Sequence, residues 1–432
     1  MKKLIILQLL AGSVLLISCK KDIGSLNGIS IDDLLGNASR TQLNSVVTGT
    51  EAGMRNNINF YLDATGVIGR EMYRFAGSEP RYNSELLGFE ENTLNNNTFY
   101  ITNPWNARYR VVKNCNILIE AATNSTFISE EERKGYLGFA KTIKAYQLLL
   151  NLNMTYQNGV RVEVDDPEDP GPLLSYEESL AAIAGLLDAG RTDLTGAAII
   201  FTLAAGFTGF DDAAGLIRFN RALAARVAVY RKLWGEALTA LNESFLDLTG
   251  PFNTGVYSSF STGPNDQLNP VFLPQNNKGE IRLAHPSYAQ DILPGDDRLA
   301  KAPLRTEAAS QDGLTSNRDV WVYTSSTAPL TIIRNEELIL LYAEANITVN
   351  PGLAATTLNR IRGGHNLTPL TGNITEAVLV TDLLYQRRYS LFYEGHRWVD
   401  LRRYNHLNEL PTDRTEDDVW EQFPVPLTEG GN

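Results

Sequence analysis

Residues 386–403 read Gln-Arg-Arg-Tyr-Ser-Leu-Phe-Tyr-Glu-Gly-His-Arg-Trp-Val-Asp-Leu-Arg-Arg, and the fold predicted for the chain follows from this stretch. No proline interrupts the chain between Pro369 and Pro411, so nothing in that interval removes a backbone donor that a helix needs. Asn373 or Thr375 supplies a side chain that caps a helix N-terminus. The sequence therefore predicts one helix that begins near these caps and runs through the stretch.

The predicted helix presents two charged residues on an otherwise apolar face. At about 100° per residue, six positions share one arc roughly 100° wide: Leu384, Arg387, Leu391, Glu394, Trp398 and Leu401. Charges among Leu and Trp are tolerated in a core when they are paired and hydrogen-bonded. We therefore expect a structural ion-pair network of Arg387, Glu394, Arg397 and Asp400 that fixes how helices dock. The alternative, a catalytic acid held by an arginine clamp, is disfavoured because no nucleophile or metal-ligand set lies nearby in the sequence.

The same stretch resembles the C-terminal signature of the SusD/RagB lipoproteins, in which Glu-Gly-x-Arg precedes Asp-Leu-x-Arg. The matching positions are Arg387, Leu391, Glu394, Gly395, Arg397, Trp398, Asp400, Leu401 and Arg403. Gln386 and Ser390 stand where the family usually has Glu, which thins its charge network. Residues 334–345, continued by 358–362, resemble a second family motif, and residues 423–429 resemble its closing Pro-Ile-Pro-x-x-Glu motif. Three motifs in the family's order make the resemblance specific.

This resemblance implies a mostly α-helical protein built on a helical-repeat, tetratricopeptide-like scaffold with two loop-rich insertions. It implies a lipid-anchored protein of the outer membrane, facing the cell exterior, that captures an oligosaccharide or a similar nutrient. The partner it implies is a TonB-dependent outer-membrane transporter of the SusC-like kind, to which the ligand is delivered. No enzymatic activity, cofactor or metal is expected. Ligand-contacting residues vary within the family, so none is transferred to this chain.

The first thirty residues are predicted to direct export and anchoring rather than to fold. A basic start, an apolar run and the sequence Leu-Ile-Ser-Cys ending at Cys19 predict a lipoprotein signal peptide over residues 1–18. The apolar run is too short to span a bilayer. Cys19 is then the lipidation site, and several acyl chains such as palmitate anchor a protein firmly. We expect residues 19–30 to form a flexible tether and residues 31–432 a single domain.

Charge and cysteine content exclude several classes of function. The formal net charge is −12 at pH 7, which argues against nucleic acid and against a basic patch that binds anionic lipid. With Cys19 lipidated, Cys115 is the one cysteine that remains, so no disulfide forms within the chain. Cys115 lies in an apolar helical run, which favours a small buried hydrophobe over a reactive thiol.

Helical patterns alternate with two loop-rich blocks. Helices are expected over 105–122, 130–156, 176–194, 219–233 and 235–248, the second and third behind capping boxes that begin at Ser129 and Ser175. Residues 57–104 and 249–332 lose this periodicity, and short β-like runs stand at 271–273 and 320–323. Long irregular segments beside a rigid scaffold are where ligand sites are commonly found.

Aromatic and planar polar residues in the two blocks predict a ligand-binding platform. Sugars present apolar C–H faces and rings of hydroxyl groups, so their sites pair aromatic rings with hydrogen-bonding side chains. We expect the two segments to meet and form one shallow platform from Tyr73, Arg74, Arg81, Tyr82, Trp321 and Tyr323. The alternative for each ring is that it pins an irregular loop to the helices.

Two other functions stay open at this point. The four histidines show no metal-ligand spacing, and the three prolines of the acidic segment 165–172 favour a solvated loop over a calcium site. A lipoprotein glycoside hydrolase would need two carboxylates facing each other in a cleft. A helical-repeat scaffold that binds a protein or peptide would need a long concave groove. Exposed loop aromatics would instead favour sugar capture.

Overall fold

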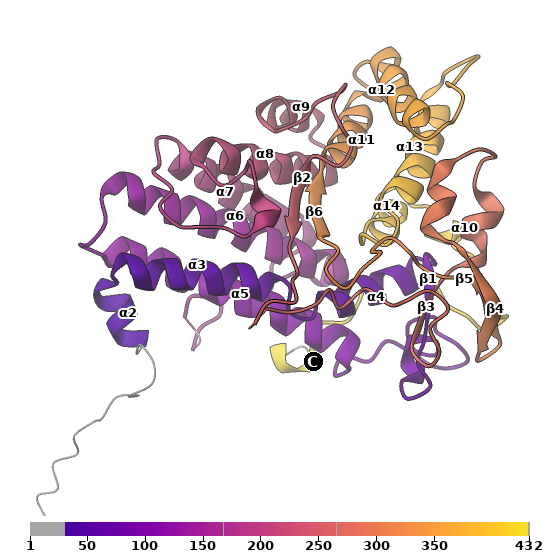
Figure 1. The fold of residues 1–432 in the computed structure, drawn as a ribbon, viewed down its shortest axis with the longest axis horizontal. Coiled ribbons are helices and arrows are strands. Elements are labelled where there is room, and N and C mark those ends of the chain that lie inside the picture. Colours follow the sequence, from indigo (N-terminus) through magenta and orange to yellow (C-terminus); the bar gives the residue numbers. More distant parts are fainter. Residues whose placement is uncertain (1–30, 167, 265, 431–432) are drawn as a thin grey trace, which may run out of the picture.

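The computed structural model describes residues 31–166, 168–264 and 266–430, so the predicted signal peptide, lipidation site and tether lie outside them. The described fold is mostly α-helical, as predicted, with short two-stranded sheets (Figure 1). None of the described helices combines the length and the apolar composition that crossing a membrane requires.

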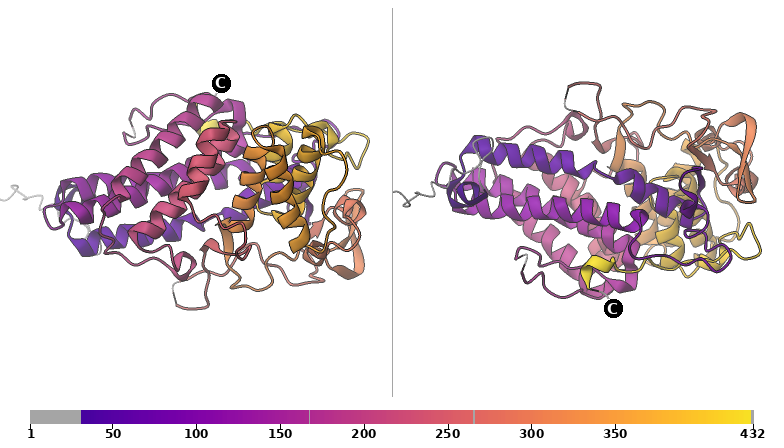
Figure 2. Two further views of the ribbon diagram at one scale, coloured as in Figure 1. Left: turned by 90° about the horizontal axis from the view of Figure 1, so that it is seen from above. Right: turned by 90° about the horizontal axis from the view of Figure 1, so that it is seen from below.

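The N-terminal half is a stack of helices in which α2, α3 and α4 pack on α5, and each helix from α5 to α9 packs on the next one along the chain (Figure 2). These helices are α2 (Ile31–Asn37), α3 (Arg40–Met54), α4 (Ile58–Ile68), α5 (Phe99–Asn124), α6 (Glu130–Thr155), α7 (Tyr176–Leu194), α8 (Ala213–Tyr230) and α9 (Trp234–Glu243). Both predicted capping boxes are confirmed: Ser129 and Ser175 each accept from the backbone N–H three residues later, in Glu132 and Glu178. Local capping chemistry thus sets where α6 and α7 begin.

The C-terminal half adds a second helical group, drawn in orange and yellow at the upper right of Figure 1. It contains α11 (Asn335–Asn346), α12 (Pro351–Gly364), α13 (Glu376–Ser390) and α14 (Arg397–Arg403), with α10 (Pro286–Asp291) beside it. Helix α11 is buried on all sides, because Leu338 and Leu341 pack into the main core while Ile339 and Leu340 pack into a smaller core shared with α12 and α13. This position between two cores explains the apolar run of residues 338–343 within α11.

The prediction of a single helix through residues 386–403 is wrong. Helix α13 ends at Ser390 and α14 begins at Arg397. Between them Tyr393 and Gly395 have positive φ angles of 59° and 82°, which a right-handed helix does not permit. A Cβ atom at Gly395 would come within 2.9 Å of the Tyr61 ring, so only glycine fits there. The apolar arc across this turn was therefore not a helical face.

The strands are short and pair across long sequence separations. β1 (Met72–Phe75) pairs with β3 (Ile281–Ala284), β2 (Gly255–Ser258) with β6 (Leu330–Arg334), and β4 (Leu304–Gln311) with β5 (Leu314–Arg318), all antiparallel. Neither predicted β-like run, 271–273 or 320–323, forms one of these strands. Such strands of four to eight residues depend on distant partners, which local sequence does not reveal.

The block 57–104 is less irregular than predicted, since it contains α4, β1 and the first turn of α5. Helix α4 is buried from Tyr61 to Ile68 without a break. A helix buried on every side has no polar face and hence no hydrophobic periodicity to detect. Prediction from periodicity therefore missed α4.

Candidate functional site

The charged residues of the C-terminal stretch do form buried ion pairs. Arg387 Nε lies 2.7 Å from Asp400 Oδ2, and Arg403 contacts both Asp400 (2.8 Å) and Glu344 (2.8 Å). Burial alone would raise the pKa of Asp400, but Arg387 and Arg403 hold it below the ordinary value. This carboxylate is therefore charged at neutral pH and ties α14 to α13.

Glu394 pairs with a residue outside the predicted network. Its carboxylate lies 3.0 Å from Arg334, which also contacts Glu336 at 3.0 Å. Burial raises the pKa of Glu394 in spite of that arginine. The pair joins the turn after α13 to the start of α11.

Arg397 makes no ion pair with any described residue, so its assignment to the network is wrong. Its Nε donates to the backbone oxygen of Gly69 at 3.1 Å. The break between α13 and α14 is the reason, because it turns Arg397 away from the face that carries Arg387.

The two segments of the predicted platform do come together, on strand β3. Tyr73 of β1 pairs with Leu283, and Leu283 forms a bridge with Asp319, just before the second segment. Burial nevertheless contradicts an exposed platform, since four of its six members are at most 6% exposed: Tyr73, Arg74, Tyr82 and Tyr323. The alternative weighed for these residues, pinning of loops to the helices, describes them.

Arg74 and Tyr323 show why these side chains are buried. The Arg74 guanidinium lies 3.4 Å from the fully buried carboxylate of Asp63, which also binds Arg282 at 2.7 Å. The Tyr323 ring packs edge-on against Tyr393, with centroids 6.2 Å apart. A buried charge cluster, rather than a ligand, holds the two segments in place.

Arg81 and Trp321 are the two platform residues that stay partly exposed. Arg81 pairs with Glu79 at 2.6 Å and lies over the Phe99 ring. Trp321 packs at a tilt against Phe272, with centroids 5.9 Å apart. Both remain candidate ligand contacts on the loop-rich face.

A cavity of about 440 Å³ lined by three tyrosines lies where α6 and α8 end and α7 begins. Its lining is Tyr156, Tyr176, Glu177, Leu180, Tyr230, Arg231, Lys232, Leu233 and Arg403. We call it the tyrosine pocket. Its size is that of a typical small-ligand site.

The rings of the tyrosine pocket are held by neighbours on both sides. Tyr156 and Tyr176 meet edge to face with centroids 4.6 Å apart. Arg402 lies over the Tyr156 ring at 4.1 Å, and Arg403 over the Tyr230 ring at 4.8 Å. Cation–π contacts of this kind fix ring orientation.

Two features of the pocket carry an energetic cost in the protein alone. Among the described residues, the buried hydroxyl groups of Tyr176 and Tyr230 have no hydrogen-bond partner. Burial raises the pKa of both phenols, so they stay protonated and able to donate. Tyr156 adopts φ 47° and ψ −114°, a backbone conformation rare outside glycine. Such costs persist where the surrounding structure enforces them, and they are concentrated at functional sites.

The rim of the pocket offers one charge of each sign. Lys232 and Glu177 are exposed and make no ion pair with a described residue. An ammonium group donates hydrogen bonds and a carboxylate accepts them, and a ring of hydroxyl groups can make both kinds of bond. Flat rings below and a donor and an acceptor above are the combination that sugar recognition requires. The sequence could have indicated these tyrosines only as aromatic residues at helix ends, because their meeting depends on how three helices pack.

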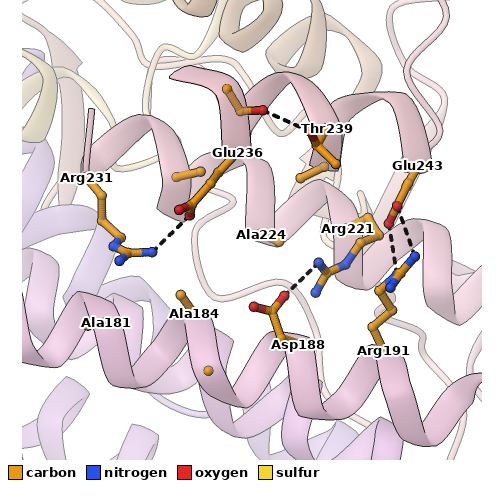
Figure 3. Close-up of a pocket in the computed structure, with 14 residues that line it drawn as sticks. Ala181, Ala184, Asp188, Arg191, Arg221, Ala224, Arg231, Glu236, Thr239 and Glu243 are labelled. Carbon is orange, nitrogen blue, oxygen red and sulfur yellow. Dashed lines mark hydrogen bonds and ion pairs between the residues drawn. The ribbon is translucent and has the colours of Figure 1, made fainter. Parts of the chain in front are cut away.

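A groove of about 600 Å³ runs beside the pocket across α7, α8 and α9, and Arg231 lines both (Figure 3). Small residues such as Ala184 and Ala224 form its floor. Its charges are paired with one another, in the pairs Arg221–Asp188 (2.8 Å), Arg191–Glu243 (2.9 Å) and Arg231–Glu236 (3.2 Å). The groove contains no aromatic platform, so its shape favours a segment of protein over a sugar.

Comparison with known proteins relates the fold of this chain to that of a known family. Residues 310–427 match the sequence model of the SusD family, and no curated protein matches the chain. A SusD superfamily protein from Bacteroides vulgatus is 17% identical, with a TM-score of 0.67 over 90% of this chain and 96% of its own. Surface glycan-binding protein A from Bacteroides thetaiotaomicron, solved with laminarihexaose, is 13% identical, with a TM-score of 0.67 over 91% and 97%.

NanU from B. fragilis is 15% identical, with a TM-score of 0.63 over 93% of this chain and 97% of its own. The TM-scores show that this chain shares its fold with these three proteins. The sequence match adds the motifs of residues 334–345 and 386–403, which lie within the matched range. Residues 310–427 therefore carry the SusD family signature, and the described fold is the one found in SusD superfamily proteins.

Proposed function

We propose that this protein captures an oligosaccharide at the cell surface, with the tyrosine pocket as its binding site. The observation that carries the proposal is the set of three tyrosine rings around a cavity whose two buried hydroxyl groups lack partners. A ligand rich in hydroxyl groups would cover the partly exposed Tyr156 ring, and a shift of the Tyr176 and Tyr230 side chains would let it hydrogen-bond their hydroxyl groups. The fold shared with a surface glycan-binding protein supports the same conclusion.

Capture on the outside of the outer membrane would be followed by delivery to a TonB-dependent, SusC-like transporter. Lipid on Cys19 would hold the protein at the membrane. The groove across α7–α9 is the surface we assign to this protein partner, because its small residues admit a close approach of another backbone. A bulky substitution such as Ala224→Trp should therefore weaken co-purification with the transporter and leave glycan affinity unchanged.

A hydrolase is the weaker proposal. Glycosidases use two carboxyl groups about 5–10 Å apart across the scissile bond. The tyrosine pocket presents one exposed carboxylate, that of Glu177. We therefore assign binding without cleavage to this site.

The test measures affinity for oligosaccharides by calorimetry, on soluble protein that starts after Gly28. Tyr156→Leu keeps the apolar bulk and removes the flat ring, so affinity should fall fivefold to tenfold, the equivalent of about 1 kcal/mol. Glu177→Gln and Lys232→Gln lie on the exposed rim and should weaken binding without changing the melting temperature. The matched control is Trp321→Ala, which removes an aromatic ring from the loop-rich face instead of from the pocket.

The two candidate surfaces give opposite patterns. Loss of affinity in the pocket variants, with Trp321→Ala unchanged, supports the tyrosine pocket. If Trp321→Ala loses affinity and the pocket variants bind like the wild type, the glycan site lies on the loop-rich face. If no oligosaccharide in a broad array binds, the proposed capture function fails.

A further inference from the structure

A second pocket, of about 490 Å³, lies between α10, α13 and α14 and shares no lining residue with the tyrosine pocket. We call it the arginine pocket, because Arg388 of α13 and Arg397 of α14 both line it. Aliphatic side chains form much of its wall: Val380, Leu384, Leu401 and Pro411. The glycan-capture proposal gives this pocket no role.

Arg397 is the unusual member of the lining. Its Nε donates to Gly69 O at 3.1 Å, and its two terminal nitrogens make no hydrogen bond or ion pair with a described residue. Arg402, which also lacks a carboxylate partner, makes hydrogen bonds to backbone carbonyl groups instead. Its two terminal nitrogens donate to the carbonyl oxygens of Glu421 and Asn153, each at 2.9 Å. Arg397 is thus a partly buried cation with a free bidentate edge on the wall of a cavity.

The other charges of the pocket are already paired. Arg388 contacts Asp291 at 2.8 Å and donates to the Ser287 hydroxyl at 2.7 Å, while His406 pairs with Glu409. With His406 counted as neutral, the lining carries two positive and two negative charges, and Arg397 is the arginine that has no carboxylate within ion-pair distance among the described residues. A buried charge without a counter-ion is costly.

The titration of nearby groups agrees with this geometry. Burial, and then repulsion from Arg388, lower the pKa of Arg397 to about 9. Burial also raises the pKa of the neighbouring Glu71 to about 8, so that carboxyl group is largely protonated at neutral pH and does not neutralise the arginine.

We propose that the arginine pocket binds the carboxylate group of a small monocarboxylate, held by the two terminal nitrogens of Arg397. A guanidinium edge matches a planar carboxylate in a bidentate, charge-assisted pair. A single carboxylate pairs with Arg397, whereas a dianion would place a second negative charge near Asp291 and Glu409. The aliphatic wall and the Tyr385 side chain would contact the body of the ligand.

The test compares acids with their uncharged esters on the wild-type protein, so it does not depend on a variant that folds. Glucuronate and benzoate represent the two sources of such a carboxylate, an acidic sugar and an acid with an apolar body. Each acid should bind at least about tenfold more tightly than its methyl ester, the scale of one charge-assisted pair. The tighter of the two acids identifies the source.

A variant pair then assigns the binding to Arg397. Arg397→Gln should abolish the preference for acid over ester, because the amide keeps a donor for Gly69 O but lacks the charge. Lys113→Gln removes one positive charge from an exposed position on α5 and should leave the preference intact. The proposal is overturned if acid and ester bind equally, if neither acid binds at about 10 mM, or if a folded Arg397→Gln retains the preference. Oligosaccharide binding at the tyrosine pocket persists in every one of these cases, so the two proposals fail separately.

Discussion

Replacing Arg387 with methionine should lower the free energy of unfolding by about 3 kcal/mol. The Arg387 side chain is fully buried, and its Nε lies 2.7 Å from Asp400. Methionine keeps most of the volume but leaves the carboxylate with fewer donors. Removing one member of a buried ion pair costs about 3–5 kcal/mol. Because Arg403 still contacts Asp400 at 2.8 Å, we expect the lower end of that range.

The pH dependence of the loss follows from the pKa of Asp400. Arg387 and Arg403 hold that pKa below its ordinary value against the effect of burial, so the ion pair contributes stability above pH 4 and loses it as pH falls. In Arg387→Met this contribution is smaller at neutral pH. The difference in stability between wild type and variant should therefore shrink below about pH 4.

Urea unfolding followed by circular dichroism, at several pH values, measures both effects. The matched control is Arg191→Met, whose ion pair with Glu243 is at the surface, where the arginine side chain is 45% exposed. Exposed pairs contribute less than about 1 kcal/mol. Adding Asp400→Asn to Arg387→Met should recover part of the lost stability. A loss in Arg387→Met no larger than in Arg191→Met would refute the assignment of a stabilising buried network.

Three further predictions concern other parts of the chain. Cys19→Ala should abolish incorporation of a labelled fatty acid, and label retained in that variant would contradict lipidation at this residue. Cys115 should not react with a thiol reagent in the folded protein, because burial raises its pKa to about 12, and it should react fully in urea; rapid reaction of the native protein would contradict burial. Burial raises the pKa of Glu71 from 4.5 to about 8, so its contribution to stability is complete below pH 4.5 and is lost as pH rises to 8. Glu71→Gln should therefore stabilise the protein at pH 7.5 by about 1–3 kcal/mol and not at pH 4; an equal effect at both pH values would contradict the shift.

The helices that could be predicted from the sequence are those whose ends depend on neighbouring residues. Ser129 and Ser175 predict the starts of α6 and α7, because all residues of a capping box lie within four consecutive positions. Elements that depend on distant partners were missed. Helix α4 has no polar face, and strand β1 exists only because β3, two hundred residues later, pairs with it.

The sequence predicted which residue types the candidate site contains, but it did not predict where the site lies. Aromatic residues with planar polar neighbours were expected to bind sugar, and the loops were the expected location. The structure uses Tyr73 and Tyr82 of that set to fill the core. A cavity lined by rings forms instead where Tyr156, Tyr176 and Tyr230 meet at helix ends, and of these three rings Tyr156 is the one that is partly exposed. Sequence reveals the residue types that a site needs, whereas burial decides which of them a ligand reaches.

The same distinction separates two arginines of the C-terminal stretch. On a continuous helix, Arg387 and Arg397 would belong to one buried network, and the pattern of residues alone gives no reason to treat them differently. Tyr393 and Gly395 break the helix between the two arginines. Arg387 therefore pairs with Asp400, whereas Arg397 lines a cavity and has no ion pair with a described residue. Whether a buried charge supports the fold or binds a ligand is therefore decided by a turn whose positive φ angles only the packed structure reveals. The contrast is measurable, because loss of Arg387 should cost stability, whereas loss of Arg397 should cost carboxylate binding.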